Sequence, residues 1–352
     1  MKSYRRRKAS FKFAVPGGAK VRRVLVLFVF IFIMAIQSFF AESVLFVYKG
    51  DMKSNLWNLS HELGQIYFSK AFPTVNVEDM EISEESTGDF MRQIGDYDLV
   101  FITDPSLERY LDNLPEPSLS KIWVCNGEKY RGYFIKDYEA TFLLGVAAGL
   151  YTGGQKKIAV LIDSIDNEMY FRMVNALLLG MREAGYNDDV EVLKVCNKDF
   201  DELFLKLKDC TAVVNLSTNS KLVKKLEEWK IDNFGFYIDQ SINGKFHNLV
   251  DVVLNWGAVY SRIYMNEVRG IKMSNNCYGF EDKALLFSPF NFRIDRKIFN
   301  ILDYFKKKLI SNEYRIFKEE LLDTNNQKIQ IDFSQDRQIF KMNKFLKGVV
   351  IE

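Results

Sequence analysis

The chain has 352 residues, of which 48% are hydrophobic and 27% are charged, and its formal net charge is +2. This length allows two domains of ordinary size, and this composition is that of a globular chain and excludes a disordered one. Nine of the first 23 residues are Lys or Arg and none is acidic, so the rest of the chain is net acidic. The body therefore lacks the basic balance that nucleic-acid binding requires.

The basic stretch is followed by an uncharged apolar segment over residues 24–41. A basic leader before an apolar segment directs a chain to the export pathway and keeps its basic end inside. Ala41 suits the position before a cleavage site, whereas Phe39 is bulky where a small residue is preferred, and the segment is almost long enough to span a bilayer. We expect residues 1–42 to be a signal peptide or a membrane anchor, and the body to be exported, periplasmic or attached to the cytoplasmic membrane.

The next part of the chain alternates strand and helix. Short apolar runs predict buried strands at 44–48, 99–102 and 122–125. A helical pattern follows the first run through about Ala71, and a second helix is predicted over 86–94. These elements indicate an α/β lobe.

A helix rich in small residues comes next. Thr141, Gly145 and Gly149 recur at every fourth position and therefore share one helix face. Because a glycine inside a helix costs about 1 kcal/mol relative to alanine, two of them predict a face that another backbone approaches closely. Gly153 and Gly154 then supply the left-handed stop.

The strand predicted over 158–162 is apolar without alternation, which fits a parallel strand covered on both faces. Asp163 follows its carboxyl end, where open α/β sheets bind ligands. Asp163, Asp166 and Glu168 lack the ligand count and the central glycine of a calcium loop. We therefore expect Asp166 or Asn167 simply to cap the next helix.

Strands and helices continue to alternate beyond this point. Strands are predicted at 190–195, 212–216, 234–238 and 249–254, and helices near 170–181, 200–207, 222–229, 256–270 and 298–309. Repeated βα units imply right-handed crossovers and a parallel sheet, and they are too many for one small sheet. We expect two interleaved lobes, the first over 43–134 and 249–284 and the second over 135–248 and 285–352.

The sequence carries no recognisable catalytic or cofactor motif. It lacks a G-x-x-x-x-G-K-[ST] loop, a G-x-S-x-G elbow, H-E-x-x-H, and G-x-G-x-x-G after a strand. His61 and His247 match no metal-ligand spacing, so we expect surface or packing roles for them. Cys196 and Cys210 could form a disulfide in an exported protein, although spacing alone cannot establish one. We expect a protein that is not an enzyme and that has no cofactor and no metal.

Polar and aromatic residues stand at strand ends and helix starts. Trp57 and Asn58 open the first predicted helix, whereas Asn126, Asp239 and Asn255 each follow a predicted strand. The carboxyl ends of parallel strands face a common crevice, where an aromatic ring, amides and a carboxylate suit a ligand that has a ring and adjacent hydroxyls. The alternative is that Trp57 and Trp256 pack the lobes together and the polar residues cap helices.

Four stretches of the body share an order and a spacing with a known family. They are YEATFLLGVAAGLYT with KIAVLID, FGFYIDQS ending at Ser241, VVLNWGAVYSRIYMNEVRG, and CYGF at 277–280. In this order they resemble the basic membrane protein family, the exported solute-binding proteins of nucleoside uptake systems. The resemblance runs from about Val44 to Asn312.

This resemblance implies a type I periplasmic binding fold, with two doubly wound parallel-sheet lobes and three crossover segments. It also implies a small-molecule ligand clamped by hinge closure and delivered, without catalysis, to an ABC transporter permease. Trp57 would take the place of the ring-stacking residue, and Asn58 keeps its amide, but Ser54 replaces an acid of the family motif. Asp239 matches the carboxylate that holds the ribose hydroxyls.

Two further positions depart from the family. Asn126 stands where the family usually has an aspartate facing the base, and Asn255 stands where it has a lysine. Losing such charges removes charge-assisted hydrogen bonds of about 1.5–3 kcal/mol each. The fold therefore transfers more safely than the nucleoside specificity. The first interpretation is an exported solute-binding protein for a nucleoside or a similar ring-bearing metabolite, and the second is a membrane-anchored sensor or interaction protein without a transport role.

Overall fold

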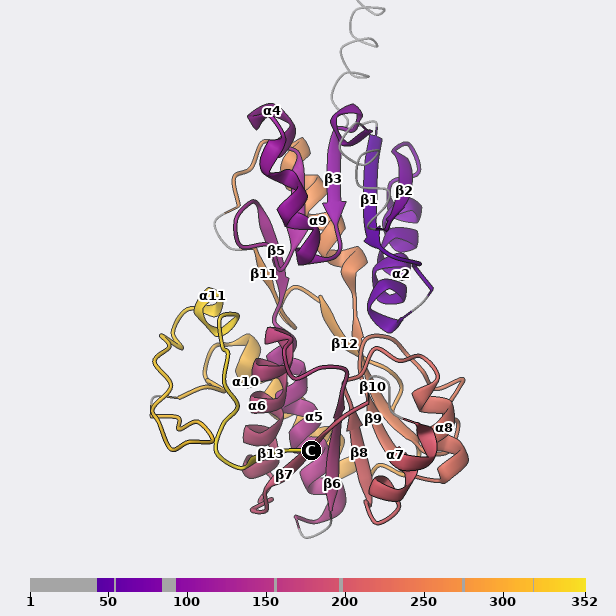
Figure 1. Cartoon of the computed structure of the whole chain (residues 1–352), viewed down its shortest axis with the longest axis vertical. Coiled ribbons are helices and arrows are strands. Elements are labelled where there is room, and N and C mark those ends of the chain that lie inside the picture. The colour runs from indigo at the N-terminus through magenta and orange to yellow at the C-terminus, as the bar shows by residue number, and fades with distance from the viewer. Residues whose placement is uncertain are drawn as a thin grey trace, which may run out of the picture. The chain divides into compact units, whose positions relative to one another are not determined.

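The computed structural model describes seven stretches of the chain: 43–53, 55–83, 93–154, 157–195, 199–273, 276–318 and 320–352. They all lie in one compact unit of the chain (Figure 1). The expected leader, Ser54, Cys196 and most of the helix predicted over 86–94 lie outside them. Among the described residues, no helix is both long enough and apolar enough to cross a membrane.

A six-stranded sheet organises the first lobe. Its order is β11-β5-β4-β3-β1-β2, and every neighbouring pair is parallel. The strands are β1 (Ser43–Lys49), β2 (Asn76–Ile82), β3 (Leu99–Ile102), β4 (Ile122–Cys125), β5 (Gly132–Ile135) and β11 (Cys277–Tyr278). The runs at 99–102 and 122–125 are β3 and β4 as predicted. The sequence did not predict β2, which is an acidic edge strand, or the short strands β5 and β11.

Both faces of this sheet are covered. Helices α2 (Leu56–Ala71) and α9 (Trp256–Val268) pack together on one face, where Phe46 contacts Phe68 and Tyr260. On the other face, Leu45 and Val47 join an apolar cluster with the short helix η2 (Pro105–Asn113). Two further short helices complete the lobe: η1 (Ile94–Asp96) and α4 (Glu116–Leu119). Because β1 is buried on both faces between Val44 and Tyr48, these five residues are hydrophobic without alternation.

A seven-stranded sheet organises the second lobe, in the order β12-β10-β9-β8-β6-β7-β13. Its strands are β6 (Ile158–Ile162), β7 (Val190–Lys194), β8 (Ala212–Asn215), β9 (Asp232–Gly235), β10 (Asn248–Leu254), β12 (Leu285–Phe287) and β13 (Val349–Ile351). All pairs are parallel except β10 and β12, which are antiparallel. Both sheets therefore have the architecture expected from repeated βα units.

Five longer helices flank the second sheet. They are α5 (Asp137–Thr152), α6 (Glu168–Glu183), α7 (Phe200–Leu207), α8 (Leu222–Trp229) and α10 (Arg296–Ile310). Helices α5, α6 and α10 pack together, whereas α7 and α8 share an apolar cluster with β6, β7 and β8. The side chain of Asn167 caps α6 by accepting a hydrogen bond from the backbone N–H of Met169, as one of the two predicted caps.

The close helix approach predicted from the glycines is confirmed. A Cβ atom at Gly145 would lie 2.1 Å from the carbonyl oxygen of Leu177, and one at Gly180 would lie 2.0 Å from that of Phe142. These contacts join α5 to α6 with almost no space between the backbones. Gly153 then ends α5 at a φ of 66°, in the left-handed region that glycine adopts without strain.

The chain passes between the lobes three times: after β5, after β10 and between β11 and β12. The expected boundary at residue 249 needs correction, because β10 pairs with β9 and β12 of the second sheet and the passage to the first lobe follows at Asn255. A strand covered on both faces has the same continuous apolar pattern in either sheet, so the sequence of β10 does not reveal its partner strands.

The tail after α10 folds back onto the second lobe (yellow in Figure 1). It contains the short helix α11 (Asp336–Ile339) and ends in β13, which pairs in parallel with β7. The sequence of this region predicted no element. Its side chains pack on α6, and isolated bridges such as that between Leu322 and Lys328 organise the loops.

Candidate functional site

A cavity of about 710 Å³ lies where strand ends of the two lobes meet. The first lobe contributes Lys49 at the end of β1, Asp104 after β3 and Asn126 after β4. The second lobe contributes Asp163 after β6 and Thr218 after β8. All five residues lie at or just after the carboxyl ends of parallel strands, which is where α/β sheets generally bind their ligands.

Trp57 lines this cavity from the first turn of α2. Its ring nitrogen donates a hydrogen bond of 3.0 Å to the carbonyl oxygen of Thr103. Its ring meets Trp256 edge to face at 5.6 Å between centroids and Tyr237 of the second lobe at 6.3 Å. Trp57 therefore packs the two lobes together and also borders the cavity, so both interpretations of this residue hold in part.

Asn58 and Asn126 border the same cavity but differ in how they are bonded. Asn58 is 2% exposed, and its amide nitrogen donates to the carbonyl oxygens of Lys49 at 3.0 Å and Asp51 at 3.1 Å. Asn126 is half-buried at a φ of 53°, and no described residue hydrogen-bonds its side-chain amide. Asn58 thus fixes the loop between β1 and α2, whereas Asn126 keeps its full bonding capacity for a ligand.

Asp239 and Asn255 are not among the residues that border the cavity. Asp239 is exposed and accepts a hydrogen bond of 3.0 Å from the backbone N–H of Ser241. The side chain of Asn255 donates to the carbonyl oxygen of Lys283 at 2.9 Å and so joins two crossover segments. Strand β9 ends at Gly235, three residues earlier than predicted, so Tyr237 and not Asp239 meets Trp57.

The sequence interpretation missed two charged residues at this site. Asp104 accepts hydrogen bonds at Oδ1 from the backbone N–H of Ser106 at 2.8 Å and from its hydroxyl at 2.5 Å, while no described residue bonds its Oδ2. Lys49 donates to the same hydroxyl at 2.8 Å. Both residues stand just past predicted strands, which is the signal that located Asn126 and could have located them.

Asp163 occupies the predicted position, but both of its oxygens are already hydrogen-bonded within the protein. It accepts four hydrogen bonds: from the Ser217 hydroxyl at 2.5 Å, from the Thr218 N–H and hydroxyl at 2.8 and 2.7 Å, and from the Tyr170 hydroxyl at 2.8 Å. Three of these bonds reach Oδ2 and one reaches Oδ1, so both oxygens of the carboxylate already have donors within the protein. Burial, followed by the nearby Tyr237 and Asp163, raises the pKa of Tyr170, so this hydroxyl stays a donor. Asp163 therefore holds the 217–218 loop in place.

That loop also connects the two lobes. The backbone N–H of Leu56, at the start of α2, donates a hydrogen bond of 2.8 Å to the carbonyl oxygen of Thr218. The first N–H groups of a helix have no partner within the helix, so this bond satisfies one of them. Together with the contact between Trp57 and Tyr237, it holds one side of the cavity closed across the lobes.

Neither histidine borders the cavity, and His61 has a packing role. His61 is fully buried, stacks on Trp256 at 4.0 Å between centroids, and its Nδ1 lies 2.5 Å from the hydroxyl of Tyr260. Burial lowers its pKa well below the usual value, so it stays neutral. Among the described residues, no three His, Cys, Asp or Glu side chains gather as metal ligands would.

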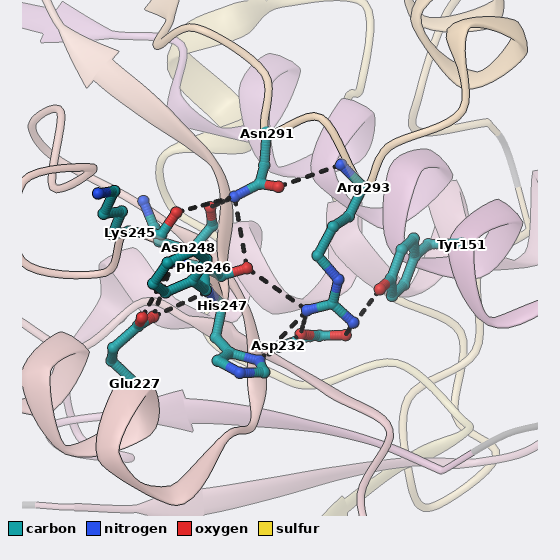
Figure 2. A network of polar contacts seen from close by, with 9 residues as sticks. All are labelled: Tyr151, Glu227, Asp232, Lys245, Phe246, His247, Asn248, Asn291 and Arg293. Carbon is teal, nitrogen blue, oxygen red and sulfur yellow. Dashed lines mark hydrogen bonds and ion pairs between the residues drawn. The ribbon is translucent and has the colours of Figure 1, made fainter.

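Figure 2 shows the polar network that holds the other histidine, at the amino end of β9. The carboxylate of Asp232 accepts hydrogen bonds from Nδ1 of His247 at 2.8 Å, from the Tyr151 hydroxyl at 2.6 Å, and from two nitrogens of Arg293. Asn291 donates to carbonyl oxygens of the adjacent loop. Since this end of the strand is remote from the cavity, the network serves the stability of the second lobe.

Comparisons with known proteins identify the fold. A scan against protein-family models and a search of curated proteins both find no match. Among solved structures, an ABC transporter solute-binding protein from Aeropyrum pernix is 14% identical with a TM-score of 0.63, covering 77% of this chain and 92% of its own. A transcriptional activator of the comK gene from Bacillus halodurans is 17% identical with a TM-score of 0.65, covering 77% and 98%.

A third solved structure is a periplasmic solute-binding protein from Actinobacillus succinogenes with bound D-allose. It is 11% identical with a TM-score of 0.50 and covers 73% of this chain and 99% of its own. With its two parallel-sheet lobes, the chain has the fold of type I periplasmic binding proteins, as predicted. At these identities the likeness shows the fold alone.

Proposed function

We propose that this protein is an exported solute-binding protein of an ABC-type uptake system, and that its ligand is a nucleoside or a similar ring-bearing metabolite. One observation carries the proposal: a cavity of about 710 Å³ lies at strand ends of both lobes and is bordered by polar groups that have spare bonding capacity. This volume falls within the roughly 300–1,000 Å³ of small-molecule sites. The solute-binding proteins among the structural neighbours support the same class.

The border of the cavity matches the chemistry of such a ligand. The ring of Trp57 offers an aromatic surface, and stacking on it is worth about 1–3 kcal/mol. The free amide of Asn126 both donates and accepts, which suits the edge of a heterocycle. Oδ2 of Asp104 accepts from a hydroxyl, and Lys49 donates to an oxygen. In this arrangement Asp239 and Asn255 would reach the ligand only if further closure moved them toward it.

Binding by itself explains these groups without a reaction. The ligand would bridge the lobes and favour their closed arrangement, and a membrane permease would recognise that arrangement. The export signal expected over residues 1–42 fits a protein of the cell envelope.

A thermal-shift screen of nucleosides and monosaccharides, on protein purified from Glu42 onward, tests the proposal. A ligand at 100 times its dissociation constant stabilises the native state by about 2.7 kcal/mol. We expect a shift with at least one ring-bearing compound and its loss in Asn126→Gly, because glycine adopts the backbone at 53° without strain. Asn326→Gly is the matched control, since Asn326 has a φ of 58° and lies in the tail. The absence of any shift across the panel would contradict the proposal.

A second function has a specific observation in its favour. Asn58, Asp239 and Asn255 are each hydrogen-bonded to backbone groups of the protein, which suits a diverged site. This would be a membrane-anchored sensor or interaction protein, and regulators do occur among the structural neighbours. N-terminal sequencing of the native protein separates the two: a start near Glu42 supports a processed binder, and an intact Met1 supports an anchored protein.

A further inference from the structure

The C-terminal segment 336–346 contacts the first crossover between the lobes, which runs from β5 of the first lobe into α5 of the second. Within it, Phe340 packs on Phe134 of β5 with 4.8 Å between ring centroids. The guanidinium of Arg337 lies 4.0 Å above the same ring. Both contacts reach a side chain of the first lobe that is only 3% exposed.

The same segment holds the crossover itself. The carboxylate of Asp336 pairs with the ammonium of Lys136 at 2.8 Å and accepts a hydrogen bond of 2.7 Å from the hydroxyl of Tyr138. Lys136 is the residue between β5 and α5, and its backbone N–H donates to the carbonyl oxygen of Tyr278 in the first lobe. Asp336 therefore contacts the crossover where the backbone must turn when the lobes move.

The other end of the segment is fixed to the second lobe. Asn175 of α6 donates to the carbonyl oxygen of Lys344 at 2.8 Å and accepts from the N–H of Leu346 at 2.8 Å. Phe345 packs on Phe171 of α6 at 4.6 Å between centroids. A few residues later, β13 joins the second sheet beside β7. The segment is thus anchored to the second lobe at residues 344–346 and contacts the first lobe at Phe134.

We propose that residues 336–346 form an inter-lobe strap that restricts hinge motion and stabilises the lobe arrangement in which Leu56 bonds to Thr218 across the cavity. A segment anchored on α6 can stay in contact with Phe134 only while the hinge angle between the lobes at Lys136 stays near its present value. Opening the lobes would break the contacts of Phe340 and Arg337 together. The strap would therefore favour the approach of the lobes. It would also raise ligand affinity, and only this second consequence rests on the proposed function.

The test measures the distance between the lobes in the full-length chain without any ligand. Spin labels at Glu116→Cys on α4 and Lys224→Cys on α8 report on the first and second lobe, because both positions are exposed. Cys196 is replaced by Ser, and Cys125, Cys210 and Cys277 are buried. The first variant, Phe340→Ala, removes the ring that packs on Phe134. The second variant, Arg337→Ala, removes only the guanidinium, leaves the buried ring of Phe340 in place and is expected to fold.

We expect both variants to broaden the distance distribution. For Arg337→Ala, the ratio of displaced to docked molecules should rise roughly 2- to 5-fold, as expected for one lost cation–π contact. Phe333→Ala is the control, because it removes a ring stacked on Phe317 inside the tail and should leave the distribution unchanged. Identical distributions in the parent protein and both variants, or equal broadening in the control, would overturn the strap. If the variants broaden the distribution but the protein binds no ring-bearing compound, the strap is supported and the proposed function is contradicted.

Discussion

Polar groups that border the cavity differ from those at the far end of the second sheet in how many hydrogen bonds the protein itself provides for them. At the cavity, no described residue bonds the amide of Asn126 or Oδ2 of Asp104. At the opposite end of β9, both oxygens of Asp232 are bonded, by His247, Tyr151 and Arg293 (Figure 2). Polar groups that the fold saturates serve stability, and groups held in place without a partner are available to a ligand.

Arg293→Ala should give the largest loss of stability. Asp232 is only 6% exposed, so losing its guanidinium partner leaves a buried carboxylate undercompensated, at a cost of about 3 kcal/mol in the free energy of unfolding. Denaturant titration measures this loss. Lys307→Ala is the control, because it breaks an exposed pair with Asp303 at 2.7 Å and should cost less than about 0.5 kcal/mol. Ligand binding by the Arg293 variant, once folded, should be unchanged.

Asp163→Ala tests a residue that borders the cavity but is hydrogen-bonded within the protein at both oxygens. Removing the carboxylate leaves four donors without their acceptor, and we expect a loss of about 2 kcal/mol in the free energy of unfolding. Asp332→Ala, at an exposed turn closed by Ser334, should cost clearly less, because water can replace the lost acceptor there. Equal losses in the two variants would show that the hydrogen bonds of Asp163 contribute no more to stability than those of an exposed turn.

Asp251 belongs to a third kind of polar site, which is buried and only partly satisfied. Its Oδ2 accepts from Gln240 and Asn248, but Oδ1 has no donor among the described residues. Burial raises the pKa of Asp251 from 3.8 to about 7. The folded state therefore binds a proton that the unfolded state releases, so this contribution to stability is complete below about pH 4 and is lost as the pH rises through 7.

The corresponding experiment compares the wild type with Asp251→Asn between pH 5 and pH 8. Wild-type stability should fall relative to the variant by up to about 1.4 kcal/mol per pH unit below pH 7, and level off above it. Glu139, whose pKa burial likewise raises to about 7, remains in both proteins and cancels in the difference. Parallel pH profiles would show that Asp251 does not titrate in this range.

Asn126→Gly should have the smallest effect on stability, within about 0.5 kcal/mol, because its side chain bonds to no described residue and glycine suits its backbone. It should nevertheless abolish the ligand-induced thermal shift. If Asn126→Gly loses stability but still binds the ligand, Asn126 serves stability and not ligand binding, which would contradict the distinction drawn above.

The sequence predicted the buried strands well because their signal is local. The runs at 99–102, 122–125 and 158–162 are strands with those bounds, since a parallel strand covered on both faces is apolar throughout. The lobe to which β10 belongs was not predictable, because only its pairing with β9 decides it. Pairing is a tertiary property that the apolar run itself does not encode.

The candidate site was predictable in position and less so in chemistry. Trp57 and Asn126 border the cavity because helix starts and strand ends converge there. Asp163, by contrast, accepts three of its four hydrogen bonds from a loop more than fifty residues away, and no local pattern shows that. Asp239 was placed by assuming that β9 ran to 238, but the strand ends at Gly235. Hydrogen bonds between distant segments decide which polar groups remain available.

The most direct test is hydrogen–deuterium exchange of the full-length chain with the best compound from the screen. A solute bound in the cavity should protect the backbone after β1, β3 and β4 in the first lobe together with residues 163–170 and 216–218 in the second. Protection confined to the hollow of about 660 Å³ among tail residues 315–334, or no protection with any ring-bearing compound, would contradict a ligand site between the lobes.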